Sequence, residues 1–108
     1  MRHHALLLPA LCATLVAAAS AQTWTQATTA TNPGNLRDAA AAFHASTNQT
    51  VVFGGYPTLS TTWLYDGTNW TAATPANTPP GRREFAMAHD LVRGRTVLFG
   101  GQGSTVPL

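Results

Sequence analysis

The sequence predicts an all-β protein built from a repeated unit of 46 residues. Shifting the chain by 46 residues aligns it with itself without a gap, and 14 of the 41 overlapping positions are identical. Seven of these identities are a Trp, a Pro, an Arg, a Val, a Phe and two Gly, which chance does not place in one register. Each unit also contains short β-branched or aromatic runs between turn-forming residues, which is typical of antiparallel strands.

Four strands are predicted in the first unit. Residues 38–44 carry small and apolar side chains between polar ends, and residues 50–53 form a β-branched and aromatic run that ends at Gly-Gly. Residues 62–65 carry large side chains and predict a third strand, and residues 70–72 begin a short fourth strand after the turn residues 66–69. A period of about 40–50 residues with four short antiparallel strands is typical of one blade of a β-propeller.

The second unit repeats only the first half of this pattern. Residues 84–90 and 96–99 correspond to the first two strands, and the sequence continues for nine residues after Phe99. A blade buries its apolar faces only against neighbouring blades, and a propeller needs roughly 4–8 of them. We therefore expect a fragment of a longer protein, with assembly of several short chains into a ring as the alternative.

The N-terminus has the pattern of a secretory signal peptide. A short basic start is followed by an uncharged run from Ala5 to Ala19, and the small residues at 19–21 predict cleavage before Gln22. The apolar run is too short for a stable membrane anchor. Cleavage would remove the only cysteine, Cys12. We expect a secreted, periplasmic or extracellular protein that has no membrane insertion after cleavage.

Composition argues against several classes of function. From residue 22 onward the chain has five Arg, four acids and no Lys, so it lacks the basic stripe that nucleic acid requires. The two histidines of this part, His44 and His89, have no second ligand at metal-binding spacing and do not occupy equivalent repeat positions. No catalytic set can be assembled from so few acids. We expect no metal, no cofactor and no nucleic-acid partner in this segment.

The anchors of the two units resemble the kelch repeat. The kelch order is an Arg, a small-apolar strand, a hydrophobic strand ending in Gly-Gly, the run Trp63-Leu64-Tyr65-Asp66 and a lone Trp, and the first unit has all of them. The resemblance implies a kelch-like β-propeller with about one and a half four-stranded antiparallel blades plus an N-terminal outer strand that closes the ring. It also implies that the repeated Arg ties neighbouring blades together. The structural anchors are Trp24, Arg37, Gly54, Gly55, Trp63, Asp66, Trp70, Arg83, Gly100 and Gly101.

The resemblance and the repeat together define the expected organisation of the chain. The Pro-rich stretch before the second unit is expected to be a linker. The expected segments are 1–21 (signal peptide), 22–35 (ring-closing fourth strand and linker), 36–74 (first complete blade), 75–81 (Pro-rich linker) and 82–108 (second blade, truncated after two strands).

The predicted function is a non-catalytic binding or interaction module with a protein or carbohydrate ligand at a loop face. Tyr56, in the loop after the first Gly-Gly, is the best candidate for ligand contact because loop residues carry function more often than scaffold residues. One alternative is a propeller enzyme, such as a galactose-oxidase-like oxidase or a sialic-acid epimerase, with its active-site residues outside this segment. Another is a structural surface repeat protein.

Overall fold

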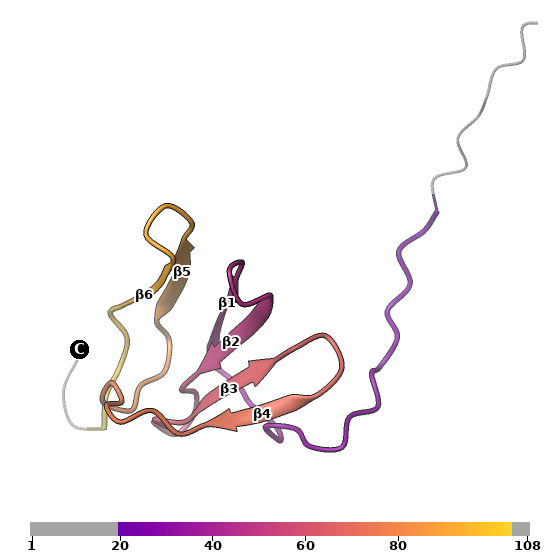
Figure 1. The fold of residues 1–108 in the computed structure, drawn as a ribbon. Coiled ribbons are helices and arrows are strands. Elements are labelled where there is room, and N and C mark those ends of the chain that lie inside the picture. Colours follow the sequence, from indigo (N-terminus) through magenta and orange to yellow (C-terminus); the bar gives the residue numbers. More distant parts are fainter. Residues whose placement is uncertain (1–19, 105–108) are drawn as a thin grey trace, which may run out of the picture.

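The computed structural model describes residues 20–104 and contains two antiparallel sheets with no helix in that range (Figure 1). The first sheet has four strands in sequence order, and the second has two. The strands are β1 (Ala40–His44), β2 (Gln49–Phe53), β3 (Thr62–Tyr65), β4 (Trp70–Ala73), β5 (Ala86–Asp90) and β6 (Arg95–Phe99).

All six predicted strands of the two units are confirmed, with shifts of one or two residues at their ends. The four-stranded meander lies within the predicted first unit (residues 36–74), and β5 and β6 lie within the second unit (residues 82–108, described to Ser104). The linker at 75–81 contains no strand. An all-β fold with one four-stranded and one two-stranded antiparallel sheet is therefore established.

The repeat recurs in the backbone as well as in the sequence. Four positions with left-handed φ angles lie 46 residues from four others with nearly the same angle. Such angles are uncommon away from glycine, so their recurrence shows that the two units share local conformation. The pairs are Asp38 and Glu84 (59° and 54°), Asn48 and Gly94 (55° and 61°), Gly54 and Gly100 (69° and 73°), and Gly55 and Gly101 (116° and 101°).

Each sheet has two faces, because successive side chains of a strand point to opposite sides and residues paired across strands point to the same side. We call the face that carries the aromatic residue before Gly-Gly face A, and the opposite face face B. The register of the strands assigns the residues. In the first unit, face A carries Ala40, Ala42, His44, Gln49, Val51, Phe53, Thr62 and Leu64, and face B carries Ala41, Phe43, Thr50, Val52, Trp63 and Tyr65. In the second unit, face A carries Ala86, Ala88, Asp90, Arg95, Val97 and Phe99, and face B carries Met87, His89, Thr96 and Leu98.

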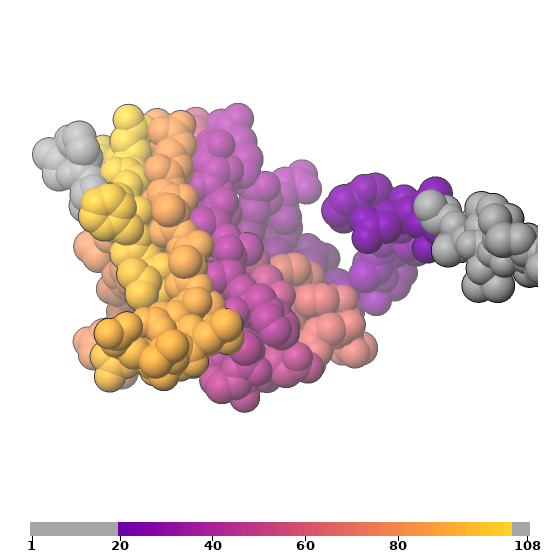
Figure 2. Space-filling view, turned by 90° about the horizontal axis from the view of Figure 1, so that it is seen from above, coloured from indigo at the N-terminus to yellow at the C-terminus, as the bar shows by residue number. Residues whose placement is uncertain are grey.

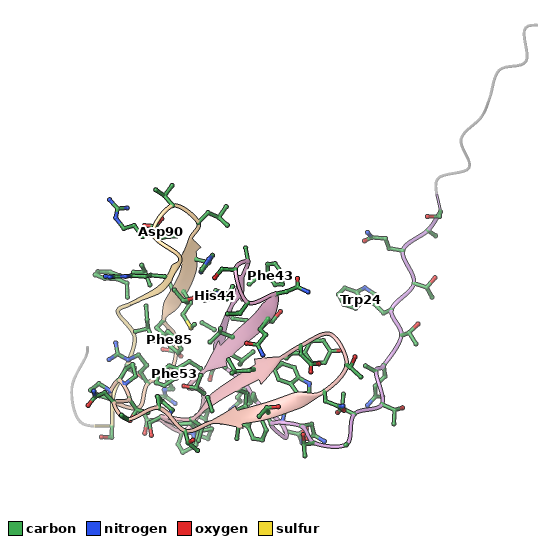
Figure 3. The ribbon with its side chains drawn as sticks, in the orientation of Figure 1. Trp24, Phe43, His44, Phe53, Phe85 and Asp90 are labelled. Carbon is green, nitrogen blue, oxygen red and sulfur yellow. The ribbon has the colours of Figure 1, made fainter. Side chains whose placement is uncertain are left out.

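The core lies where face A of the first unit packs on face B of the second. The space-filling view shows the second unit beside the β1–β2 part of the first (Figure 2), and β1 is the strand that contacts β5 and β6. Phe53 is only 3% exposed, and its ring meets Phe85 edge-on with 5.8 Å between the ring centroids (Figure 3). Burying an aromatic side chain in this way contributes about 1.5–3 kcal/mol of transfer free energy.

Backbone hydrogen bonds join the two units at the Gly-Gly end of the strands. The Gly55 N–H donates to the carbonyl of Arg82 at 2.9 Å, and the Arg82 N–H donates to the carbonyl of Leu59 at 3.2 Å. The Glu84 N–H donates to the carbonyl of Asp38 at 3.0 Å. These bonds fix the register between the units, because a buried backbone polar group without a partner is costly.

The N-terminal segment, expected as an outer strand that closes a ring, is described from residue 20. Residues 22–35 contain no strand, and Trp24 is 99% exposed and lies away from the sheets (Figure 3). The segment touches the first sheet where Ala30 N–H donates to Asn69 Oδ1 at 3.1 Å and Thr31 Oγ1 donates to the Trp70 carbonyl. The outer strand is expected to complete the last blade of a closed ring, and the described sheets include no such blade, so the ring-closing role of this segment stays a prediction.

The predicted signal peptide lies almost wholly outside the described residues, and so does Cys12. Between residues 20 and 104 no helix is long and apolar enough to cross a bilayer.

Candidate functional site

The candidate site is the edge formed by the Gly-Gly ends of both units, and Tyr56 is its most prominent side chain. The chain turns out of β2 through Gly54 and Gly55, and the Tyr56 N–H then donates to the carbonyl of Arg37 at 2.9 Å. This bond holds the residue beside the start of β1. The Tyr56 side chain remains exposed, with 44% of its surface accessible to solvent.

Two guanidinium groups flank the ring of Tyr56. The Arg37 Cζ atom lies 3.6 Å from the ring centroid, and the Arg83 Cζ atom, from the next unit, lies 5.3 Å away. Guanidinium groups within about 6 Å of an aromatic centroid are attracted to the ring, with about 0.5–1 kcal/mol at an exposed site. The two repeated arginines and the predicted ligand residue therefore meet at one edge.

Arg83 is also held by Gln102, which occupies the repeat position equivalent to Tyr56. The Nε and Nη2 atoms of Arg83 both donate to Gln102 Oε1, at 3.1 and 2.7 Å. The Gln102 N–H donates to the Arg83 carbonyl at 2.8 Å, as the Tyr56 N–H does to Arg37. Equivalent residues thus contact the arginine of their own unit: Tyr56 contacts Arg37 with its ring, and Gln102 contacts Arg83 with its amide.

The hydrogen bonds that tie the units together do not come from the guanidinium groups of Arg37 and Arg83. They come from the backbones around Arg82 and Glu84. The Arg82 side chain is buried and donates to the carbonyls of Pro80 at 3.1 Å and Gly100 at 3.0 Å, so it braces the second unit internally. Sequence reasoning missed Arg82, because its counterpart in the first unit is Leu36 and the position carries no repeated signal.

The charge of this edge is not neutralised by direct ion pairs. Within residues 20–104, an ion pair joins Arg93 Nη1 and Asp90 Oδ2, which lie 2.8 Å apart at the opposite end of β5. The carboxylates of Asp38 and Glu84 are exposed and lie beyond ion-pair distance of the arginines. Guanidinium groups can bind a carboxylate, and the exposed aromatic ring beside them can contact an apolar or sugar surface.

The other repeat anchors have structural positions. Trp63 and Trp70 lie half-buried on face B of the first sheet, and the Trp70 ring is 4.9 Å from that of Tyr65. Asp66 Oδ1 accepts the backbone N–H groups of Thr68 and Asn69, both at 2.8 Å, and these bonds hold the pKa of Asp66 below its ordinary value. The aromatic residues of the outer strands therefore pack in the sheet, whereas Tyr56 stays accessible.

The two histidines lie together, which the sequence reasoning did not anticipate. Their ring centroids are 4.3 Å apart, with His44 on face A of the first unit and His89 on face B of the second. Nδ1 of His44 is within 3.1 Å of Ser46 Oγ, and Nδ1 of His89 is 3.3 Å from Thr96 Oγ1. Among the described residues no three His, Cys, Asp or Glu side chains gather closely enough to hold a metal ion.

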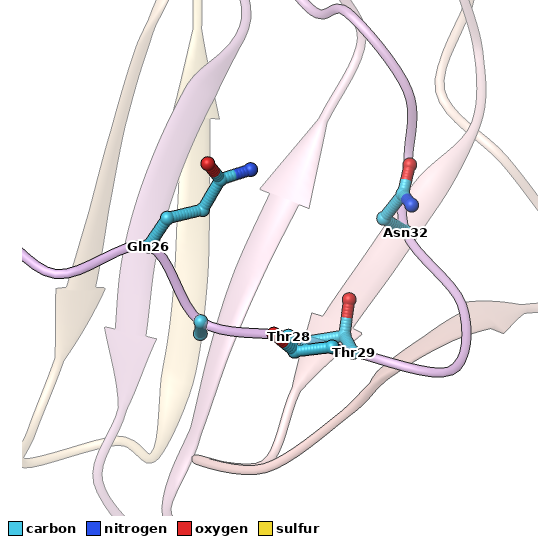
Figure 4. Close-up of a pocket in the computed structure, with 5 residues that line it drawn as sticks. Gln26, Thr28, Thr29 and Asn32 are labelled. Carbon is cyan, nitrogen blue, oxygen red and sulfur yellow. The ribbon is translucent and has the colours of Figure 1, made fainter.

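The polar hollow along the N-terminal segment is a poor candidate for a site. It is lined by residues 26–29 and Asn32, all from one stretch of extended chain (Figure 4). No second element contributes a side chain, so nothing fixes its shape. A binding site requires groups held by a rigid scaffold, as Tyr56 and Arg83 are held.

Comparison with known proteins was made at three levels. No protein-family model, no curated protein and no solved structure matches this chain. The repeat, the packing of face A on face B and the arginine–tyrosine edge are therefore the observations from which a function is proposed.

Proposed function

We propose that this chain is part of an exported, kelch-like β-propeller that acts as a non-catalytic binding module. The supporting observations are the four-stranded antiparallel unit, the recurrence of its backbone angles in the second unit, and the face-to-face packing of the two. Stacked repeats that share one orientation bring equivalent loops to one edge of the array. The edge with Tyr56 is where the loops after both Gly-Gly pairs come together.

The ligand that this edge fits best carries carboxylate groups next to an apolar or sugar surface. The single observation that carries the proposal is the exposed Tyr56 ring with the Arg37 and Arg83 guanidinium groups 3.6 and 5.3 Å from its centroid. Planar guanidinium groups bind carboxylates through two parallel hydrogen bonds, and the adjacent ring offers a flat contact surface. An acidic polysaccharide satisfies both requirements, and an acidic peptide with an aromatic or aliphatic side chain does so as well.

Binding of polygalacturonate, measured by titration calorimetry with neutral dextran as the comparison, tests this proposal. Replacement of Arg37 by Lys keeps the charge but removes the fork-shaped donor, and Tyr56→Ala removes the ring. The Arg37 variant is expected to weaken binding about tenfold or more, since a hydrogen bond to a charged group contributes about 1.5–3 kcal/mol. The Tyr56 variant is expected to weaken binding because it removes the flat contact surface.

Arg95→Lys is the matched control, because Arg95 is exposed at the start of β6, away from the Gly-Gly end of the sheets. It should leave the affinity unchanged. Equal binding of dextran and polygalacturonate, or equal losses in the Arg37 and Arg95 variants, would contradict the proposed site.

A further inference from the structure

At its Gly-Gly end, face A of the second unit is an apolar surface that lacks a partner in the described chain. Phe99 is 81% exposed and Val97 is 56% exposed on this face. Their equivalents in the first unit are Phe53, which is buried, and Val51, which is half-buried. Contiguous exposed apolar side chains of this kind mark interaction surfaces.

The molecule itself indicates what fits face A. Face A of the first unit is covered by face B of the second, and Met87, Thr96 and Leu98 of that face B line a small hollow together with Val51 and Phe53. One further face B is available in the described chain, on β1 and β2 of the first unit. There Phe43 is 54% exposed, and Ala41 is exposed beside it.

We propose that a second copy of this chain docks its first-unit face B onto the second-unit face A, so that copies associate head to tail. The 46-residue repeat gives the expected register. Just as the Gly55 N–H donates to the Arg82 carbonyl, the Gly101 N–H would donate to the carbonyl of Leu36 in the second copy. Likewise, the Asp38 N–H of the second copy would donate to the Glu84 carbonyl, as Glu84 N–H donates to Asp38.

The space around Phe99 and Gly100 agrees with this arrangement. A Cβ atom added at Gly54 would lie 2.5 Å from the Arg82 carbonyl oxygen of the packed unit, whereas one added at Gly100 meets nothing within 4 Å. The position of Phe85 is taken by Ala39 in the first unit. The smaller side chain leaves room for the Phe99 ring to reach Val52 and Trp63 of the second copy. No charged residue lies on the β1 or β2 part of that face B.

A head-to-tail contact uses two different surfaces, so each added copy leaves one of each free. Such an interface closes into a ring or continues as a filament, and it does not stop at a dimer unless one surface is blocked. This association does not depend on the ligand proposed above, because Arg37 and Tyr56 lie on the Gly-Gly edge and not on either face.

Sedimentation equilibrium of the full 108-residue chain tests the proposal. The wild-type chain is expected to form oligomers that grow with concentration. Phe99→Glu blocks face A, and Phe43→Glu blocks face B; each variant alone should sediment as a monomer. Both side chains are exposed, so both variants should keep the circular dichroism of the folded chain. An equimolar mixture of the two should give one species of two chains, since one intact face A meets one intact face B.

Leu91→Glu is the control, because Leu91 is exposed in the β5–β6 turn, outside both faces, and should leave association intact. A wild-type chain that is monomeric at every concentration would overturn the proposal, whatever the variants do. Self-association of either blocked variant alone would overturn it in favour of a symmetric contact between like faces. Should Phe99→Glu fail to fold, Val97→Lys blocks the same face.

Discussion

Phe53 and Phe99 are the same residue at the same place in two units, yet one is buried and the other exposed. Each is the last residue of its strand, and each precedes Gly-Gly with nearly equal φ angles. The difference is that Phe53 has Phe85 of the next unit against it, while Phe99 is 81% exposed in the described chain. The repeat sequence therefore determines the strand, but the neighbouring unit determines whether its side chains are buried.

Gly54 and Gly100 extend this comparison to the backbone. Their left-handed φ angles are nearly equal, so the requirement for glycine conformation is a local property of each unit. Their surroundings differ, because a Cβ atom added at Gly54 would meet the Arg82 carbonyl and the Phe85 ring, whereas one added at Gly100 would meet nothing within 4 Å. The same substitution at both members of such a pair therefore separates two contributions to the free energy of unfolding. The loss shared by both variants comes from the turn, and the extra loss in the first unit comes from the contact between the units.

The largest expected difference is between Phe53→Ala and Phe99→Ala. Truncation of the buried ring leaves a cavity at the contact between the units and should lower the free energy of unfolding by about 3–5 kcal/mol. Truncation of the exposed ring should change it by less than about 0.5 kcal/mol. Urea unfolding at a protein concentration where the chain is monomeric measures both values.

Equal losses in the two variants would show that Phe53 is not covered by the second unit in solution. Phe53→Leu is a useful intermediate, since it keeps most of the apolar volume while removing the edge-on contact with Phe85.

A smaller difference is expected between Gly54→Ala and Gly100→Ala. Both place a side chain at positive φ, which costs about 1–2 kcal/mol. At Gly54 the added methyl group must also displace the Arg82 carbonyl, which accepts the Gly55 N–H that joins the units. We expect Gly54→Ala to cost about 3 kcal/mol or more in total and Gly100→Ala about 1 kcal/mol.

Thermal unfolding by calorimetry provides the measurement for this pair. If the two glycine variants lose the same stability, the close approach of the second unit at Gly54 makes no energetic contribution.

The strands could be predicted from the sequence because their signals are local. The runs at 50–53 and 96–99 combine β-branched and aromatic residues with a Gly-Gly end, and both form strands. The strand expected around Trp24 relied on a partner strand rather than on its own residues, and no such partner is present in the described sheets. The ring-closing strand therefore stays a prediction that rests on repeat position alone.

The candidate site was predicted only in part, because its geometry depends on how the units stack. Tyr56 was identified from its loop position, but the convergence of Arg37 and Arg83 on its ring follows from packing between units. The His44 and His89 pair was missed for the same reason. A contact between stacked repeats joins a face A residue of one unit to a face B residue of the next. His44 and His89 are therefore 45 positions apart and are not equivalent in the 46-residue repeat.

The turns at the far end of the two units offer the smallest and most local comparison. Position 44 holds a histidine whose Nδ1 lies near the hydroxyls of Ser46 and Thr47. The equivalent Asp90 accepts the N–H groups of Val92 and Arg93 at 3.0 and 3.1 Å, and it pairs with the Arg93 guanidinium. The side-chain hydrogen bond from Arg93, followed by its backbone N–H, holds the pKa of Asp90 below its ordinary value.

A carboxyl whose pKa is lowered by folding stabilises the folded state above its ordinary pKa, and this stabilisation is lost as the pH falls through the lowered value. The β5–β6 turn should therefore loosen on acidification below about pH 4. Hydrogen exchange of the Val92 and Arg93 amides should accelerate there relative to Ser46 and Thr47, after correction for intrinsic rates. Asp90→Asn should remove the effect, and Arg93→Ala should reduce it, because the two backbone bonds remain. Acceleration that is the same in the Asp90→Asn variant would assign the acid sensitivity to another group.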